Sequence, residues 1–126
     1  MRQSPDALAR LQDGRIAMMK AVLKMNDDQL KLWAPVEAQI RAAFTARQQA
    51  RAEWRQAREQ GAAAPPLPDR LDRASQRMAK RAADLKAFAD VFRPFYASLS
   101  DEQKAVAGVV LRAAHGRRVR ARWAMR

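Results

Sequence analysis

Apolar residues recur at spacings of three and four along most of the chain, which is the spacing of one face of an α-helix. Before the first apolar stripe, Ser4, Pro5 and Asp6 suit the cap, the first position and the first turn of a helix. These signals predict a helix over about residues 5–25. Its stripe consists of Leu8, Leu11, Met18, Val22 and Met25, interrupted by Arg15.

A polar break over residues 25–29, Met-Asn-Asp-Asp-Gln, ends this helix and starts the next. Asn26 is a good helix cap, and Gln29 stands where its side chain can reach back to the N–H of the cap. Asp27 and Asp28 favour the positive end of the helix dipole. The break therefore predicts a tight turn into a second helix.

The second helix is predicted to run to about Gln60, over roughly 50 Å if it is continuous. Pro35 lies inside it, so we expect a kink or a local break there. Gly61 can end the helix, and residues 61–68 form the only linker-like segment because they contain three prolines. The stripe of this helix is Trp33, Val36, Ile40, Ala43, Arg47, Ala50, Trp54 and Ala57.

A third helix is predicted to begin at a cap on Asp69 and to bend at Pro94 near its end. Residues 99–103, Leu-Ser-Asp-Glu-Gln, then repeat the earlier break: an apolar residue, a cap, two acids and a glutamine. A fourth helix follows up to Gly116, and an arginine-rich tail occupies residues 117–126. The third stripe is Leu71, Ala74, Met78, Ala82, Leu85, Phe88, Phe92, Phe95 and Leu99, and the fourth is Val106, Val109, Val110 and Ala113.

These segments predict an all-α fold of four helices, short-long-long-short, arranged as two helical hairpins. Val, Ile and Thr number only 10, and no segment alternates apolar and polar residues over the length of a strand. We expect one domain over residues 1–116, followed by the tail. Composition alone also allows disorder, since Leu, Ile, Val and Phe total 23 of 126 residues, but the periodicity outweighs it for residues 5–115.

Charge and the rare residue types narrow the function. The net charge is +12, there is no cysteine, and His115 is the single histidine. Disulfides, thiolate chemistry and a histidine cage within one chain are therefore excluded, and we predict no metal and no cofactor. No apolar stretch approaches the roughly 18 residues of a membrane span.

The helix lengths favour a homodimer. A compact globule of this size has a radius of gyration near 14 Å, roughly 35 Å across, which is shorter than the second helix. We therefore expect an elongated monomer whose alanine-rich seams bury little area each. A second copy of the chain would cover much of the remaining apolar surface.

The two breaks carry a family resemblance. Leu99-Ser100-Asp101-Glu102-Gln103 fits an LTxxQ pattern with Ser for Thr, and Met25-Asn26-Asp27-Asp28-Gln29 fits it more loosely. Two such motifs in a small, basic, all-helical chain resemble the Spy/CpxP family, also called the LTXXQ motif family, over about residues 10–112. The stretch from Phe95 to Lys104 is most similar to its proteobacterial branch.

This resemblance implies a periplasmic protein and, as in several family members, an ATP-independent chaperone. It also implies a thin, antiparallel, cradle-like dimer with a basic concave face that carries apolar patches. Some members restrain a membrane sensor kinase, and some relatives bind metal ions. The sequence departs from the family in two respects: no secretory signal precedes the first helix, so we expect it to have been removed, and the tail has no counterpart in the motif.

The motif residues are interpreted as helix caps. The acid pairs Asp27/Asp28 and Asp101/Glu102 lack a nearby nucleophile, histidine or glycine-rich loop, so no enzyme is predicted. As a lone histidine beside arginines, His115 is interpreted as a helix C-terminal residue and not as a metal ligand.

Basic and aromatic residues on the second helix are the candidate partner-binding site. Three functions remain open: a holdase that captures unfolded or acidic clients, a regulator of a sensor kinase, and a nucleic-acid-binding protein. No helix-turn-helix, zinc finger or aromatic platform supports the last, and the motif pair favours the first. The candidate client-binding residues are Phe44, Arg47, Arg51, Trp54, Arg55 and Arg58.

Overall fold

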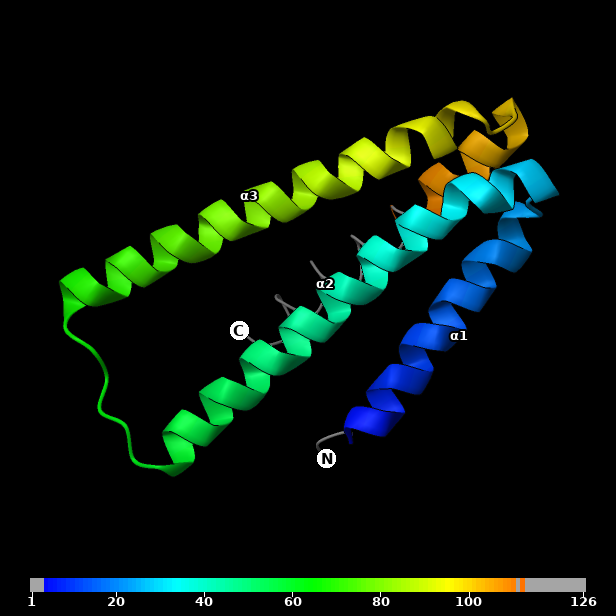
Figure 1. Cartoon of the computed structure of the whole chain (residues 1–126). Coiled ribbons are helices and arrows are strands. Elements are labelled where there is room, and N and C mark those ends of the chain that lie inside the picture. Colours follow the sequence, from blue (N-terminus) through cyan, green and yellow to red (C-terminus); the bar gives the residue numbers. More distant parts are fainter. Residues whose placement is uncertain (1–3, 111, 113–126) are drawn as a thin grey trace. The chain divides into compact units, whose positions relative to one another are not determined.

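The computed structural model describes residues 4–110 and 112, and all regular structure in them is helical. The helices are α1 (Pro5–Leu23), α2 (Asp27–Glu59) and α3 (Leu67–Ala97), followed by a fourth helix over residues 101–110 (Figure 1). The predicted all-α fold of four helices is therefore confirmed for the described chain. His115, Gly116 and the arginine-rich tail lie outside the described residues, so the predictions made for them stay predictions.

The first helix is capped as its sequence indicates. The Ser4 side chain accepts a hydrogen bond from the Ala7 N–H at 3.2 Å, and Pro5 follows it. The helix ends at Leu23, two residues before the predicted boundary, because Lys24 adopts a left-handed conformation with φ of 48°. This turn leads directly into the first motif.

Gly61 ends α2 through a Schellman motif. The Gly61 N–H donates to the Arg58 carbonyl at 3.0 Å, and the Ala62 N–H donates to the Ala57 carbonyl at 3.1 Å. Gly61 has φ of 70°, a conformation that a residue without Cβ adopts at little cost. The helix continues without interruption through Pro35, so the local break allowed for in the sequence prediction is absent.

The start of α3 corrects the predicted cap. The Arg70 N–H donates to the Pro66 carbonyl at 3.0 Å, which places the helix start two residues before Asp69. Asp69 lies in the first turn, where its charge still suits the helix dipole. Pro68 can be helical here because the N–H groups of a first turn have no partner within the helix. The non-helical linker therefore covers residues 60–66 instead of 61–68.

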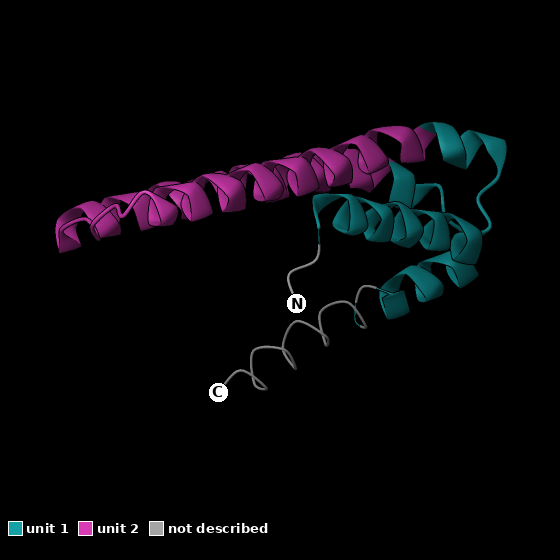
Figure 2. Ribbon diagram, turned by 90° about the horizontal axis from the view of Figure 1, so that it is seen from below, with its two compact units in different colours: residues 1–31, 95–126 teal, residues 32–94 magenta. Residues whose placement is uncertain are grey.

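The chain divides into two compact units (Figure 2). Unit 1 comprises residues 1–31 and 95–126, and unit 2 comprises residues 32–94. The described part of unit 1 contains α1, both motifs and the fourth helix. Its buried apolar side chains are Ile16, Leu23, Phe95, Leu99 and Ala107. The predicted single domain over residues 1–116 stays a prediction.

Unit 2 is a helical hairpin. The remainder of α2 and of α3 run antiparallel and are joined by residues 60–66 (Figure 1). Its buried apolar side chains among the described residues are Trp33 and Val36, both near the beginning of α2. Burial falls towards the linker, where large apolar side chains stay exposed. No helix of the described chain has the length and apolar character needed to cross a membrane.

Candidate functional site

Each motif forms a reciprocal capping box. In the first, the Gln29 N–H donates to the Asn26 side chain at 2.8 Å, and the Asn26 N–H donates to Oε1 of Gln29 at 3.1 Å. In the second, the Gln103 N–H donates to the Ser100 hydroxyl oxygen at 3.1 Å, and the Ser100 N–H donates to Oε1 of Gln103 at 2.9 Å. Each box satisfies two N–H groups that a helix start leaves without partners.

The two motif glutamines also bind each other, although 74 residues separate them. Nε2 of Gln29 donates to Oε1 of Gln103 at 2.9 Å, and Nε2 of Gln103 donates to Oε1 of Gln29 at 3.0 Å. Each amide then reaches the end of a helix that precedes the other motif. Gln29 donates to the Ser98 carbonyl at 2.9 Å, and Gln103 donates to the Leu23 carbonyl at 2.8 Å.

This geometry uses the full hydrogen-bonding capacity of both amides. A glutamine side chain can donate two hydrogen bonds and accept two, and Gln29 and Gln103 each do so. The backbone groups fix the orientation of each amide, because Oε1 must meet an N–H and Nε2 must meet a carbonyl. Gln29 is only 5% exposed, so these bonds are formed where a missing partner is costly.

The sequence indicated the capping boxes, but their contact with each other was not predicted. The one available signal was the similar order of residue types in the two breaks, since equivalent turns can pack against each other. Asp27, Asp28, Asp101 and Glu102 lie exposed in first helical turns, where they favour the helix dipoles. Among residues 4–110 and 112, no three His, Asp or Glu side chains come together as a group able to hold a metal ion.

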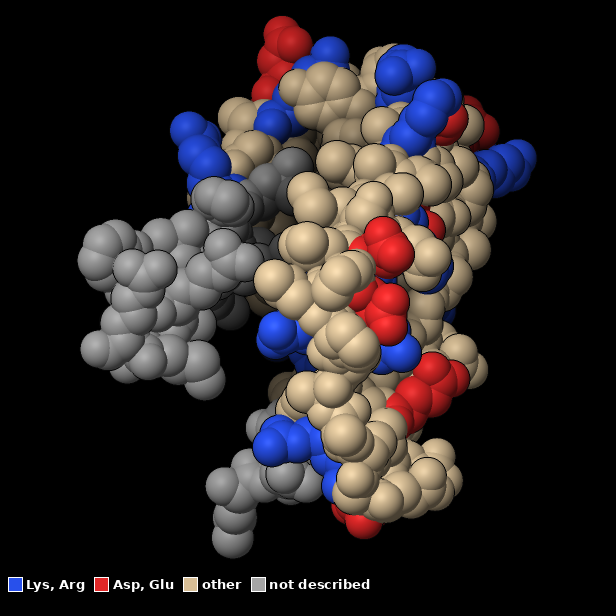
Figure 3. All heavy atoms as spheres, turned by 90° about the vertical axis from the view of Figure 1, so that its left-hand side faces the viewer, with Lys and Arg blue, Asp and Glu red and all other residues tan. Residues whose placement is uncertain are grey.

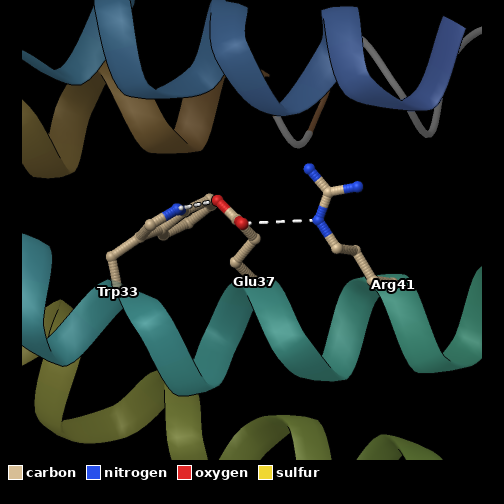
Figure 4. Close-up of polar contacts among 3 residues, drawn as sticks. All are labelled: Trp33, Glu37 and Arg41. Atoms are coloured by element: carbon tan, nitrogen blue, oxygen red, sulfur yellow. Dashed lines mark hydrogen bonds and ion pairs between the residues drawn. The ribbon is translucent and has the colours of Figure 1, made fainter. Parts of the chain in front are cut away.

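In unit 2, a polar row begins at the buried Trp33 (Figure 4). The indole N–H of Trp33 donates to Oε1 of Glu37 at 3.1 Å, and Nε of Arg41 donates to Oε2 of the same carboxylate at 3.3 Å. The three residues are four apart and therefore share one face of α2. One carboxylate thus orients both the buried indole and the guanidinium.

The candidate client-binding residues follow one side of α2 towards the linker. Trp54 is 60% exposed, and the guanidinium carbon of Arg58 lies 4.7 Å from the centre of its ring. That distance is typical of a cation–π contact. Phe44 and Arg55 are half-buried, whereas Arg47 and Arg51 are exposed. We call this set of six residues the client face.

On the part of α3 that belongs to unit 2, four large apolar side chains stay exposed, and we call them the α3 stripe. Leu67 is 59% exposed, Leu71 62%, and Met78 and Leu85 69% each. The sequence pattern placed the last three on an apolar seam without indicating what covers it. Their spacings of four and seven put them on one side of the helix.

Unit 2 is basic, but its charges are mixed. Residues 32–94 contain twelve Lys and Arg against seven Asp and Glu. Pairs four residues apart link Lys80 to Asp84 and Lys86 to Asp90, both at 3.5 Å. On the face seen in Figure 3, Lys and Arg are scattered among Asp and Glu, with large areas of other residues between them. Unit 2 therefore carries basic side chains together with exposed apolar ones such as Trp54 and Leu71.

A family model described as "LTXXQ motif family protein" matches residues 11–109, which include both motifs and the whole of unit 2. No curated protein and no solved structure shows significant similarity to the chain.

Proposed function

The chain belongs to the LTXXQ motif family, which includes Spy/CpxP-like periplasmic proteins, and we propose that it is an ATP-independent periplasmic holdase. It captures unfolded or acidic proteins on the client face of α2. In this proposal it is a binding protein and not an enzyme, and it needs no cofactor.

The observation that carries the proposal is the exposure of Trp54 within a row of arginines. Arg51, Trp54 and Arg58 follow one another at spacings of three and four, so they share one side of α2, and the Arg58 guanidinium lies over the ring. Unfolded chains present apolar segments together with charge. Long-range charge raises the rate of encounter with an acidic chain, whereas apolar contact with Trp54 lengthens the stay of the client.

We also propose that the protein is a homodimer and that the α3 stripe lies in its interface. Four exposed apolar side chains on one side of a helix are an unfavourable surface for a monomer. A second copy of the same stripe is apolar in the same pattern and would remove both from water. Met78→Glu combined with Leu85→Glu should shift the sedimentation coefficient from dimer to monomer at micromolar concentration.

The holdase is tested by the aggregation of an unfolded acidic client at two salt concentrations. Arg51→Glu combined with Arg55→Glu should slow client capture and flatten its salt dependence. Trp54→Ser should leave the capture rate unchanged and speed release. Thermal melts of the variants show whether the fold is retained.

Matched control variants show whether an effect comes from the client face itself or only from a change in net charge or in exposed apolar surface. Arg10→Glu combined with Arg15→Glu changes the net charge by the same amount on α1 and should have little effect. Val109→Ser removes a side chain that is 59% exposed on the fourth helix. If the control pair and the client-face pair slow capture equally, the charge of α2 only keeps the protein soluble.

The sequence left two other functions open, nucleic-acid binding and regulation of a sensor kinase. Each would be recognised by a separate binding measurement. Binding to any duplex DNA with a steep salt slope would favour nucleic acid as the partner. Selective binding to the folded sensor domain of a membrane kinase, without capture of unfolded clients, would favour the regulator.

A further inference from the structure

Two prolines interrupt the hydrogen-bonding of the long helices where the chain passes between its compact units. The chain crosses between units 1 and 2 only at Lys31/Leu32 and at Pro94/Phe95. Both crossings lie inside helices, the first in α2 and the second in α3. Pro35 and Pro94 are the prolines inside those helices.

Each proline removes one helical hydrogen bond beside a crossing. Proline has no backbone N–H, so residue 35 donates nothing to the Lys31 carbonyl and residue 94 donates nothing to the Asp90 carbonyl. The bond missing in α2 would have spanned the first crossing. The bond missing in α3 would have ended at the second. Both covalent connections between the units are therefore weakened within one helical turn of the boundary.

The positions of the other prolines strengthen this observation. Pro5 begins α1, Pro65 and Pro66 lie in the linker, and Pro68 lies in the first turn of α3. Those places cost a proline little, because no helical N–H is needed there. Only the prolines at the crossings carry the full cost of a helix interior. A proline in a helix interior is a usual cause of a bend in that helix.

The exposure of the two prolines indicates the side on which each helix can open. Pro35 and Pro94 are exposed, as are the residues four positions earlier, Lys31 and Asp90. Both prolines therefore lie on solvent-facing sides of their helices, where a helix can open without exposing a buried side chain of its own at these positions. Because a proline ring presses against the carbonyl of the preceding turn, helices bend away from the proline side.

We propose that Pro35 and Pro94 form a paired hinge that lets unit 2 change its orientation relative to unit 1. Both helices have to bend for the units to reorient. If only one of them were weakened, the other, still rigid, would prevent the movement. The hinge does not depend on what the client face binds, so failure of the proposed function would leave it standing.

Distances between spin labels test the hinge directly, and the absence of cysteine in the chain makes labelling simple. One pair spans the units, with cysteines replacing the exposed Ala17 and Gln76. Two further pairs lie within single units: Ala17 with Ala105, and Gln49 with Gln76. We expect a broad distance distribution for the spanning pair and narrow ones for both control pairs.

Removal of both prolines then identifies the cause. Pro35→Ala combined with Pro94→Ala should narrow the spanning distribution, whereas Pro5→Ala should leave it unchanged. A narrow distribution in the parent protein would overturn the hinge. So would a spanning distribution that stays broad when both prolines are gone.

Hydrogen exchange provides a second, label-free measurement. Amides within residues 32–36 should exchange faster than those in the middle of α2, and Pro35→Ala should slow them. If exchange in this segment is as slow as in the middle of the helix, the first crossing does not open and the hinge is wrong.

Discussion

The two units of this chain are stabilised in different ways. In unit 1, helix ends are tied together by side-chain amides, and Phe95 and Ile16 are almost fully buried. In unit 2, the ion pairs Lys80–Asp84 and Lys86–Asp90 each lie within α3, and Leu85 and Met78 are largely exposed. Both units expose apolar side chains, Met18 and Val109 in unit 1 among them, but unit 2 exposes them in a row along α3 and, among its described residues, buries only Trp33 and Val36.

The largest expected difference between the units comes from replacing one large apolar side chain by alanine in each. Phe95→Ala should lower the free energy of unfolding by about 3–5 kcal/mol, because it leaves a cavity at a fully buried site. Leu85→Ala should lower it by less than about 0.5 kcal/mol, because that side chain is already exposed. Denaturant unfolding below micromolar concentration checks both. A large loss from Leu85→Ala that appears only at high concentration would show that a second copy covers the stripe.

Replacing one of the paired glutamines by a glutamate should distinguish the stability that comes from the capping box from the stability that comes from the bonds between the motifs. In Gln103→Glu the carboxylate can still accept the Ser100 N–H, but it loses both donors and faces the Leu23 carbonyl and Oε1 of Gln29. We expect a loss of about 2–4 kcal/mol at neutral pH, because a carboxylate then faces two acceptors: the Leu23 carbonyl, which loses the Gln103 donor, and Oε1 of Gln29, which keeps only the Asn26 N–H. Ser100→Ala is the control, with a loss of about 1 kcal/mol from the cap alone.

The same variant has a defined pH dependence. Facing two acceptors, the introduced carboxyl should have a pKa in the folded state above its value in the unfolded chain. The loss of stability is then fully present above the folded pKa and is relieved as the pH falls below it. Melts of parent and variant at neutral and mildly acidic pH should show the difference shrinking. A difference that is constant with pH would mean that the carboxylate escapes to solvent.

Gly14→Ala should stabilise unit 1 by about 0.5–1 kcal/mol, since glycine inside a helix costs backbone entropy. An added Cβ at this position meets nothing within 4 Å, so no clash offsets the gain. If unit 1 unfolds as one body, hydrogen exchange in the fourth helix should slow as well. Protection confined to α1 would show that the motif bonds do not couple the helices.

The smallest effect is expected for an ion pair of unit 2. Lys80→Ala should cost about 0.3–0.5 kcal/mol, the usual worth of an exposed pair four residues apart, and less in high salt. A double-mutant cycle with Asp84→Ala measures it. A coupling well above that range would mean that the pair is shielded from water by a partner.

Local signals in the sequence predicted most of the helix pattern. Ser4, Asn26, Ser100 and Gly61 mark helix ends through chemistry that acts within a few residues, and such chemistry is visible in sequence. The start of α3 was placed two residues late because Asp69 looks like a cap, whereas the helix already begins at Leu67 and the Pro66 carbonyl accepts its first helical hydrogen bond. A helix start of this kind has no characteristic side chain, so the sequence gives no local signal for it.

The candidate site was harder to predict than the fold. Each motif was recognisable alone, but the bond between Gln29 and Gln103 joins residues far apart in the chain, and no periodicity encodes such a pairing. The apolar stripe of α3 was visible as a pattern. Its exposure was not, because spacing identifies a face of a helix and says nothing about what lies against it.

The bond between the two motifs has a chemical consequence of its own. Carboxylates and ammonium groups lose their attraction when protons or salt neutralise or screen them, but amides keep their dipoles in acid, in alkali and in brine. The hydrogen bonds between the Gln29 and Gln103 side chains should therefore persist through changes of pH and salt concentration. The ion pairs of unit 2 should not, so a change of pH or salt concentration should weaken those pairs and leave the connection between the motifs intact.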